Sequence, residues 1–143
     1  MLKVNLWIAV ILLFSLTLSF SSLMADEAVP QEYQEMTNPL TLEKHEVSYW
    51  RTQFLGKCAL CHGKNGDGQG GSALELADEG YPQPSNFTDK AFMNSKSDGE
   101  LFYQIEMGGE EKSAMPDFGE DSAQGWGEEK IWRMVAFIRL FAK

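Results

Sequence analysis

The sequence predicts one all-α domain behind an apolar N-terminal segment. Apolar residues recur with helical spacing in three separate segments, and clusters of glycine and proline stand between these segments. No segment has the pattern of a strand. The chain has 143 residues, which leaves room after the apolar segment for one small domain with a modest core.

Residues 1–25 have the layout of a secretory signal peptide. Lys3 is the only charged side chain before Asp26, a long apolar run lies between the two, and Ala25 is the small residue at its end. The sequence therefore predicts cleavage after Ala25.

An uncleaved membrane anchor over residues 4–24 is the alternative. Leu23 is larger than the residue usually found at that point of a signal peptide, and about 20 apolar residues suffice to cross a bilayer. Because Lys3 keeps the short N-terminal end in the cytoplasm, the rest of the chain is exported in either case. We therefore expect a periplasmic protein, or one anchored in the cytoplasmic membrane and facing the periplasm.

Residues 26–41 contain two prolines and several Gln and Glu without helical or strand period, and we interpret them as a linker or arm. The predicted domain covers residues 42–143. Its first helix starts near Leu42, with apolar residues at helical spacing that end at a cysteine: Val47, Trp50, Phe54 and Cys58.

The middle of the domain alternates turns with short helices. Residues 63–71 are too rich in glycine for regular structure, a short helix over 72–77 follows, and the prolines in 81–84 require extended backbone. A second main helix begins after a cap at Ser97 or Asp98 and ends before Gly108. An irregular segment containing Met115 and Pro116 comes next.

The last helix has the clearest pattern and runs over residues 128–141. Ile131, Val135 and Ile138 share one face. Acidic residues stand at its start and basic residues near its end, as the helix dipole favours.

Five consecutive residues, Cys58-Ala59-Leu60-Cys61-His62, carry the chemistry of this chain. They hold its only two cysteines. The two thiols lie about one helical turn apart, so they can add to the two vinyl groups of one porphyrin while His62 reaches its iron. The motif therefore predicts covalent attachment of one haem.

Two other kinds of site fit the motif less well. A thioredoxin-like redox pair follows a buried strand, whereas this motif follows a helical pattern. A zinc site needs four ligands, and the only other histidine is His45.

The domain resembles a class I c-type cytochrome of the bacterial monohaem kind. The likeness extends from about Leu42 to Lys143, in three helices, a C-x-x-C-H motif after the first and a Met-Pro loop before the last. Three further segments resemble ones that recur in these proteins: Cys61–Gly68, Pro84–Asp89 and Ser97–Leu101. The resemblance implies a cytochrome c fold around one haem c, bound through Cys58 and Cys61 with His62 as one axial ligand.

The resemblance also implies that the first and last helices cross near one haem edge through an aromatic residue of each. Phe54 and either Trp132 or Phe137 are the candidates. The sequence departs from the family pattern at Trp50, where a helix-crossing glycine is common, and at Gly70–Gly71, where a proline often helps to orient the imidazole.

The second axial ligand is predicted to be Met115. It stands in a loop held extended by Pro116, and the segment Ala114–Gly119 matches the ligand loop of the family. A thioether suits iron(II) and raises the reduction potential. Met107 and His45 are the alternatives. Met93 and Met134, and Met107 if it is not the ligand, are expected in the core.

The charge composition limits which classes of binding partner suit this protein. Acidic residues outnumber basic ones 21 to 12, for a formal charge of −9, so nucleic acid and anionic membrane surfaces are excluded as partners. The same acidity also keeps an exported protein soluble. Redox proteins with basic docking surfaces fit this charge.

With both axial positions filled, the expected function is one-electron transfer between exported or membrane-bound redox partners. No catalytic acid–base pair or nucleophile stands out, so we do not expect an enzyme. One alternative is a haem c subunit of a larger oxidoreductase, for instance in a respiratory chain. Another is a gas or redox sensor with an open or labile sixth site.

Overall fold

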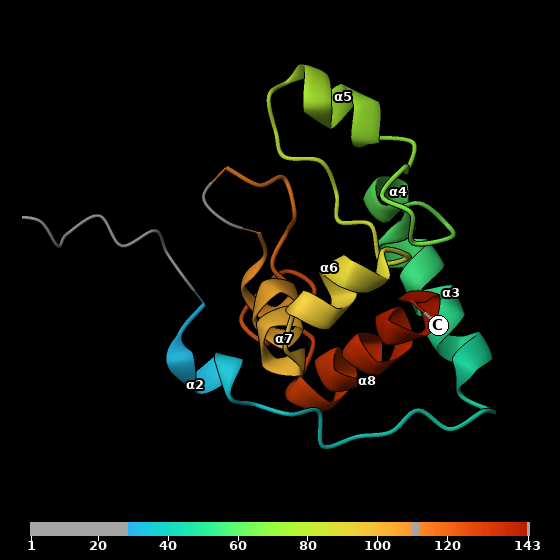
Figure 1. Cartoon of the computed structure of the whole chain (residues 1–143), viewed down its shortest axis with the longest axis vertical. Helices are drawn as coiled ribbons and strands as arrows, with labels where there is room; N and C mark the ends of the chain where they lie inside the picture. The colour runs from blue at the N-terminus through green and yellow to red at the C-terminus, as the bar shows by residue number, and fades with distance from the viewer. Residues whose placement is uncertain (1–28, 110–111, 143) are drawn as a thin grey trace, which may run out of the picture.

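The computed structural model describes residues 29–109 and 112–142. The predicted signal peptide or anchor at residues 1–25 lies outside these ranges. Within them all regular structure is helical, which confirms the all-α prediction (Figure 1). The elements in chain order are α2 Gln31–Gln34, α3 Val47–Lys57, α4 Ala59–His62, α5 Ala73–Asp78, α6 Lys90–Ser95, α7 Asp98–Met107, α8 Glu128–Ile138 and the 3₁₀-helix η1 Arg139–Ala142.

Helix α8 lies between α3 and α7 and packs against both (Figure 1). Phe54 of α3 meets Phe137 of α8 with ring centroids 5.7 Å apart. Trp132 instead packs on Phe102 of α7, at 4.3 Å. Of the two aromatic residues predicted for the contact between the first and last helices, Phe137 is therefore the one that makes it.

Local signals explain both ends of α7. The Ser97 hydroxyl accepts from the Glu100 amide at 3.0 Å, and the Glu100 carboxylate accepts from the Ser97 amide at 2.7 Å. This capping box satisfies two amides that the helix itself leaves free. The helix ends before Gly108, whose φ of 83° few other residues adopt. Both ends agree with the prediction.

Helix α3 starts at Val47 rather than at Leu42, so the predicted start is wrong by five residues. Leu42 is half-buried against the core, and the Glu46 amide closes a turn on the Glu43 carbonyl at 2.9 Å. The Glu46 carboxylate then binds Arg133 of α8 at 2.6 Å. Packing and this ion pair favour a turn where the sequence pattern alone continues the helix.

The C-terminal helix changes character at its end. The α-helix stops at Ile138 and η1 continues to Ala142, whereas the sequence predicts one helix to residue 141. A final turn with 3₁₀ hydrogen bonds is common at the end of an α-helix, where the last carbonyls lack intrahelical donors. Arg139 ties this end to Asp98 at 2.9 Å, and it also donates to the carbonyls of Met93 and Lys96.

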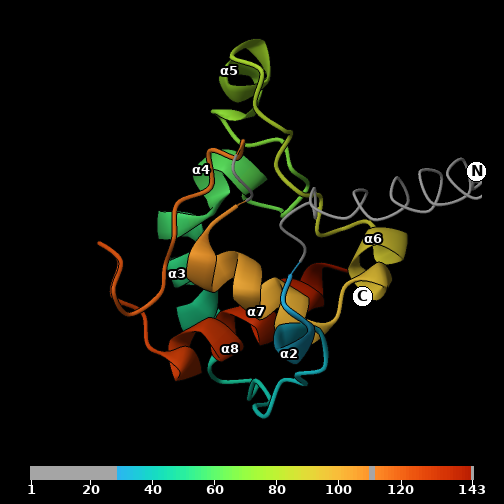
Figure 2. The same ribbon diagram turned by 90° about the vertical axis from the view of Figure 1, so that its left-hand side faces the viewer.

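Two further short helices are α5, which projects from the domain, and α6, which contributes Met93 to the core. Helix α5 lies within one residue of its prediction and projects beyond α4, away from α7 and α8 (Figures 1 and 2). Helix α6 is not predicted. Its signal is Asp89, whose carboxylate accepts from the amides of Ala91 and Phe92 at 2.9 and 3.1 Å.

The described part of the predicted arm lies along the domain. Helix α2 sits against α7 (Figure 2), and the Asn38 side chain donates to the Trp132 carbonyl at 2.8 Å. None of the helices in the described ranges is long and apolar enough to cross a membrane.

Candidate haem site

A cavity of about 230 Å³ lies beside the C-x-x-C-H motif. The motif forms one part of its wall, the extended segment 82–85 another, and the loop 113–116 a third. Apolar side chains of the core complete the lining, among them Phe54, Ile105 and Ile138.

The two cysteines enter this cavity from the junction of two helices. Cys58 stands between α3 and α4, and its carbonyl accepts from the amides of Cys61 at 3.2 Å and His62 at 2.9 Å. This single turn brings both thiols and the imidazole to the same cavity. Both cysteines are free and half-buried.

The environment of Cys58 disfavours the alternative of a redox pair. Burial, with a smaller contribution from Cys61, raises the pKa of the Cys58 thiol to about 12. Reactive and metal-binding cysteines are thiolates with a lowered pKa. No strand precedes the motif in the described chain, as a thioredoxin-like site would require.

A zinc site finds no support either. Over residues 29–109 and 112–142, no three His, Cys, Asp or Glu side chains gather to hold a metal ion of their own. His45 is exposed and does not line the cavity.

The His62 ring is held in one orientation. It is 9% exposed, its Nδ1 lies 3.1 Å from the Ser85 carbonyl oxygen, and it stacks on Phe87 at 4.6 Å. Burial lowers the pKa of His62, and the bond to Ser85 opposes this shift. Burial therefore favours a neutral imidazole, and the bond to Ser85 selects the tautomer that donates from Nδ1 and leaves Nε2 for a metal.

The carbonyl that orients His62 comes from a place the sequence did not indicate. It belongs to Ser85, directly after Pro84, and not to the neighbourhood of Gly70–Gly71. Gly70 has a different role: its amide donates to the Cys61 carbonyl at 3.0 Å, and an added Cβ would overlap the carbonyls of Leu60 and Cys61. Glycine therefore permits close approach of two chain segments there.

Met115 enters the cavity from the loop after α7. It is half-buried and packs against the core. Its amide donates to Ser113 Oγ at 3.1 Å, and its carbonyl accepts from the Gly109 amide at 3.2 Å. The loop therefore fixes the backbone on both sides of this thioether.

The other candidate methionines differ in how deeply they are buried. Met93 and Met134 are each 1% exposed, as predicted for core residues, although Met134 also lines the cavity. Met107 is 56% exposed and does not line it. The expectation that Met107 lies in the core is wrong, because it sits two residues after the buried Ile105 and so on the opposite face of α7.

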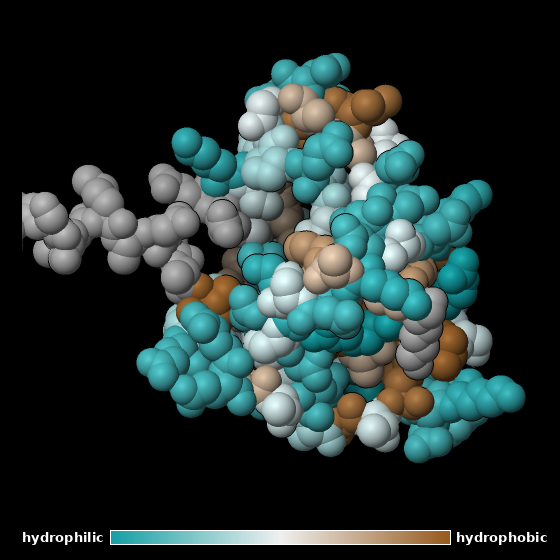
Figure 3. All heavy atoms as spheres, viewed as in Figure 1, coloured by the Kyte–Doolittle hydropathy of each residue, from teal (hydrophilic) through white to brown (hydrophobic). Residues whose placement is uncertain are grey.

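These residues fit a haem. The cavity offers two thiols one turn apart, an imidazole with one nitrogen already engaged, a thioether from a separate loop and apolar walls. Hydrophilic residues and smaller groups of hydrophobic ones share the face shown in Figure 3.

Comparisons with known proteins agree with this fit. The family model described as Cytochrome c matches residues 51–140, a stretch that includes the motif, α7, the Met115 loop and α8. No curated protein matches the chain. The chain therefore belongs to the cytochrome c family, whose members carry covalently bound haem c and transfer electrons.

Proposed function

We propose that this protein is an exported one-electron carrier whose haem c is joined to Cys58 and Cys61 and ligated by His62 and Met115. The observation that supports it most is that these four side chains line one cavity although Met115 is far from the others in sequence. Met107, the rival ligand, is exposed and lies outside that lining.

A bound haem supplies an iron that alternates between iron(II) and iron(III). The chain's own residues favour this exchange and disfavour binding of a substrate. His62 is fixed by Ser85 and Phe87, and the Met115 backbone is fixed by Ser113 and Gly109. If His62 and Met115 both bound the iron, they would leave it no open position, and a pair held in this way would change little between redox states.

The surroundings of the cavity favour the reduced state. Apolar side chains such as Phe54 and Ile105 form much of the lining and make the site less polar than water, and a thioether ligand favours iron(II). We therefore expect a reduction potential above that of a bis-histidine haem in the same protein.

Partners are expected to reach the haem near α4 and α5. Leu60, within the motif, is 67% exposed on α4, and Leu74 is 77% exposed on α5. Acidic residues follow Leu74 along α5. Redox proteins with basic docking surfaces suit this combination. A fixed partner would make the chain a haem c subunit of a larger oxidoreductase.

The location of the carrier follows from the N-terminal sequence. Residues 1–25 support export as a signal peptide or, if uncleaved, as an anchor in the cytoplasmic membrane. In either form the haem domain lies in the periplasm, and there we propose that it serves a respiratory chain.

The ligand assignment is tested by a matched pair of variants, Met115→Ala and Met107→Ala. The oxidised wild type is expected to show the weak charge-transfer band at the red end of the visible spectrum that marks a methionine–iron bond. Met115→Ala should abolish the band, lower the reduction potential and admit carbon monoxide or cyanide to the iron. Met107→Ala should leave all three unchanged, because Met107 is exposed.

The opposite behaviour of the two variants would make Met107 the ligand. A wild type that lacks the band and binds carbon monoxide rapidly at neutral pH would favour the sensor over the carrier.

A further inference from the structure

The segment 29–41, hereafter the strap, crosses α7 at a glycine. The Gly99 amide donates to the Met36 carbonyl at 3.2 Å. A Cβ added to Gly99 would overlap the Tyr33 carbonyl. The absence of a side chain at this position of α7 is therefore what lets the strap lie directly on the helix.

Tyr33 connects the strap to the C-terminal half of α7. Its ring stacks on Phe102 at 6.1 Å and meets the edge of Tyr103 at 4.8 Å. Its hydroxyl donates to Glu106 Oε2 at 2.7 Å. This bond is the largest cause that raises the pKa of Tyr33 to about 12.

Glu106 also holds the loop that bears Met115. Its backbone carbonyl accepts from the Phe118 amide at 3.2 Å and from the Gly119 amide at 2.9 Å, and the Ile105 carbonyl accepts from Phe118 at 3.0 Å. A Cβ on Gly119 would press on both the carbonyl and the side chain of Glu106. The returning end of the loop therefore rests on Glu106.

The carbonyls that receive this loop belong to the last turn of α7. Carbonyls there have no partner within the helix, so the loop completes the helix end and depends on its being well formed. A last turn at a helix end readily frays. The Tyr33 hydroxyl binds the side chain of the same residue whose backbone supports the loop.

We propose that Tyr33 and Glu106 form a positioning pair, through which the strap holds the last turn of α7 and thereby keeps the Met115 loop closed over the haem. The inference rests on the proposed ligation by Met115. It gives residues 29–41 a role in the redox site beyond that of a linker.

The test uses full-length oxidised holoprotein and imidazole as the competing ligand. Imidazole binds the iron only when the Met115 loop opens, so its association rate reports that opening. Tyr33→Phe keeps the aromatic stack and removes only the hydroxyl. We expect imidazole to bind about tenfold faster, as the loss of a hydrogen bond to a charged group implies, while the charge-transfer band remains.

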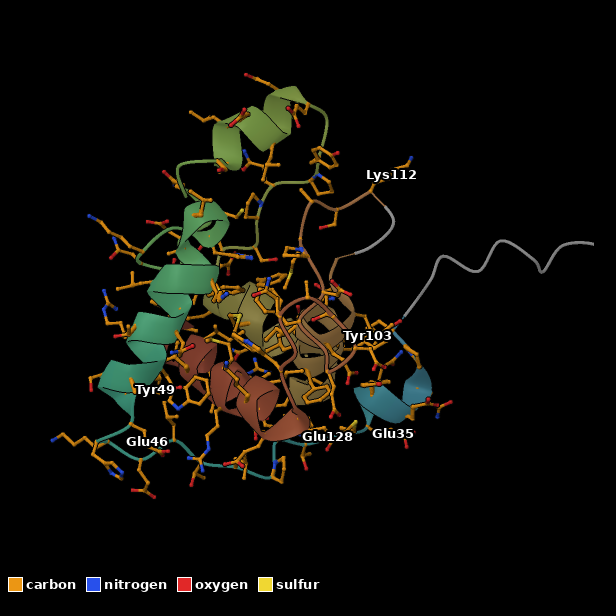
Figure 4. All side chains as sticks on the ribbon, turned by 180° about the vertical axis from the view of Figure 1, so that it is seen from behind. Glu35, Glu46, Tyr49, Tyr103, Lys112 and Glu128 are labelled. Carbon is orange, nitrogen blue, oxygen red and sulfur yellow. The ribbon has the colours of Figure 1, made fainter. Side chains whose placement is uncertain are left out.

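Three further variants sharpen the test. Glu106→Ala should match Tyr33→Phe, and Glu106→Gln, which keeps an acceptor oxygen, should stay within about threefold of wild type. Tyr49→Phe is the matched control, because Tyr49 is 54% exposed on α3 (Figure 4). It should bind imidazole at the wild-type rate.

Amide hydrogen exchange tests the Tyr33–Glu106 proposal independently of the proposal that Met115 binds the iron. Exchange at Phe118 and Gly119 should rise in Tyr33→Phe and in Glu106→Ala without a change in α3. Wild-type imidazole rates and wild-type exchange in both variants would overturn the pair even if the band is present. A wild type without the band would overturn the ligation, and faster exchange at these two amides would then still support the pair.

Discussion

The hydrogen bond from His62 to Ser85 decides what the imidazole can do. With Nδ1 engaged at 3.1 Å and the ring stacked on Phe87, only Nε2 is left for iron, and the ring cannot rotate freely. The partner lies 23 residues further along the chain. No local pattern indicates such a contact, which is why the sequence identified His62 but not its support.

Covalent attachment of haem is predicted to depend on the thiols of Cys58 and Cys61. Cys58→Ser or Cys61→Ser should sharply lower the yield of protein that keeps its colour through acid–acetone extraction, because each thiol forms one thioether bond. The double variant should keep none. Full retention of colour by the double variant would contradict the assignment of these cysteines.

Tyr33 provides a prediction about pH. Its pKa is raised to about 12 in the folded protein, against about 10 in an unfolded chain. The folded state therefore holds this proton more tightly, so the contribution to stability is complete below pH of about 10 and is lost as the pH rises toward 12. Thermal unfolding midpoints should fall over this interval more steeply for wild type than for Tyr33→Phe. Parallel curves would show that the phenol is not held by Glu106.

Helix α7 and the start of α8 were predicted well because their signals are local. A capping box, a terminal glycine and apolar spacing all lie within one helix. The start of α3 was wrong because it depends on Glu46 meeting Arg133, which is 87 residues away. Helix α6 was missed because its six residues are too few for a visible period, and only the Asp89 cap marks it.

Two helical glycines should respond to substitution with opposite signs. Gly56→Ala in α3 meets nothing within 4 Å and should stabilise the protein by about 0.5–1 kcal/mol. Gly99→Ala in α7 forces a Cβ into the Tyr33 carbonyl and should destabilise it by about 1–3 kcal/mol. Denaturant unfolding of the two variants gives both values. A stabilised Gly99→Ala would mean that the strap does not lie on α7.

Across the whole molecule, the sequence predicted the kind of site, a haem site, better than it predicted where the surrounding residues lie in the fold. Cys58, Cys61 and His62 were recognisable because five adjacent residues contain the motif. Met115 was predicted from its loop and the family resemblance, and the cavity it shares with His62 supports that choice. The position of Met107 was missed although its spacing from Ile105 already places the two residues on opposite faces of α7.

The strap was the least predictable part. Its sequence lacks a period, and its order in the described range comes from contacts with α7 and α8 through Tyr33 and Asn38. Such contacts have no local signature. The haem site is lined by stretches from across the domain, among them the motif, residues 82–85 and the loop 113–116, and of these the motif has the most recognisable local pattern.

The most direct test of the account is the environment of the methionine methyl groups in the reduced holoprotein. With methionine labelled in its methyl carbon, a methyl held over the haem plane gives one resonance shifted far upfield by the ring current. The account predicts a single such resonance, lost in Met115→Ala and retained in Met107→Ala. Its retention in Met115→Ala, or its absence from wild type, would contradict ligation by Met115.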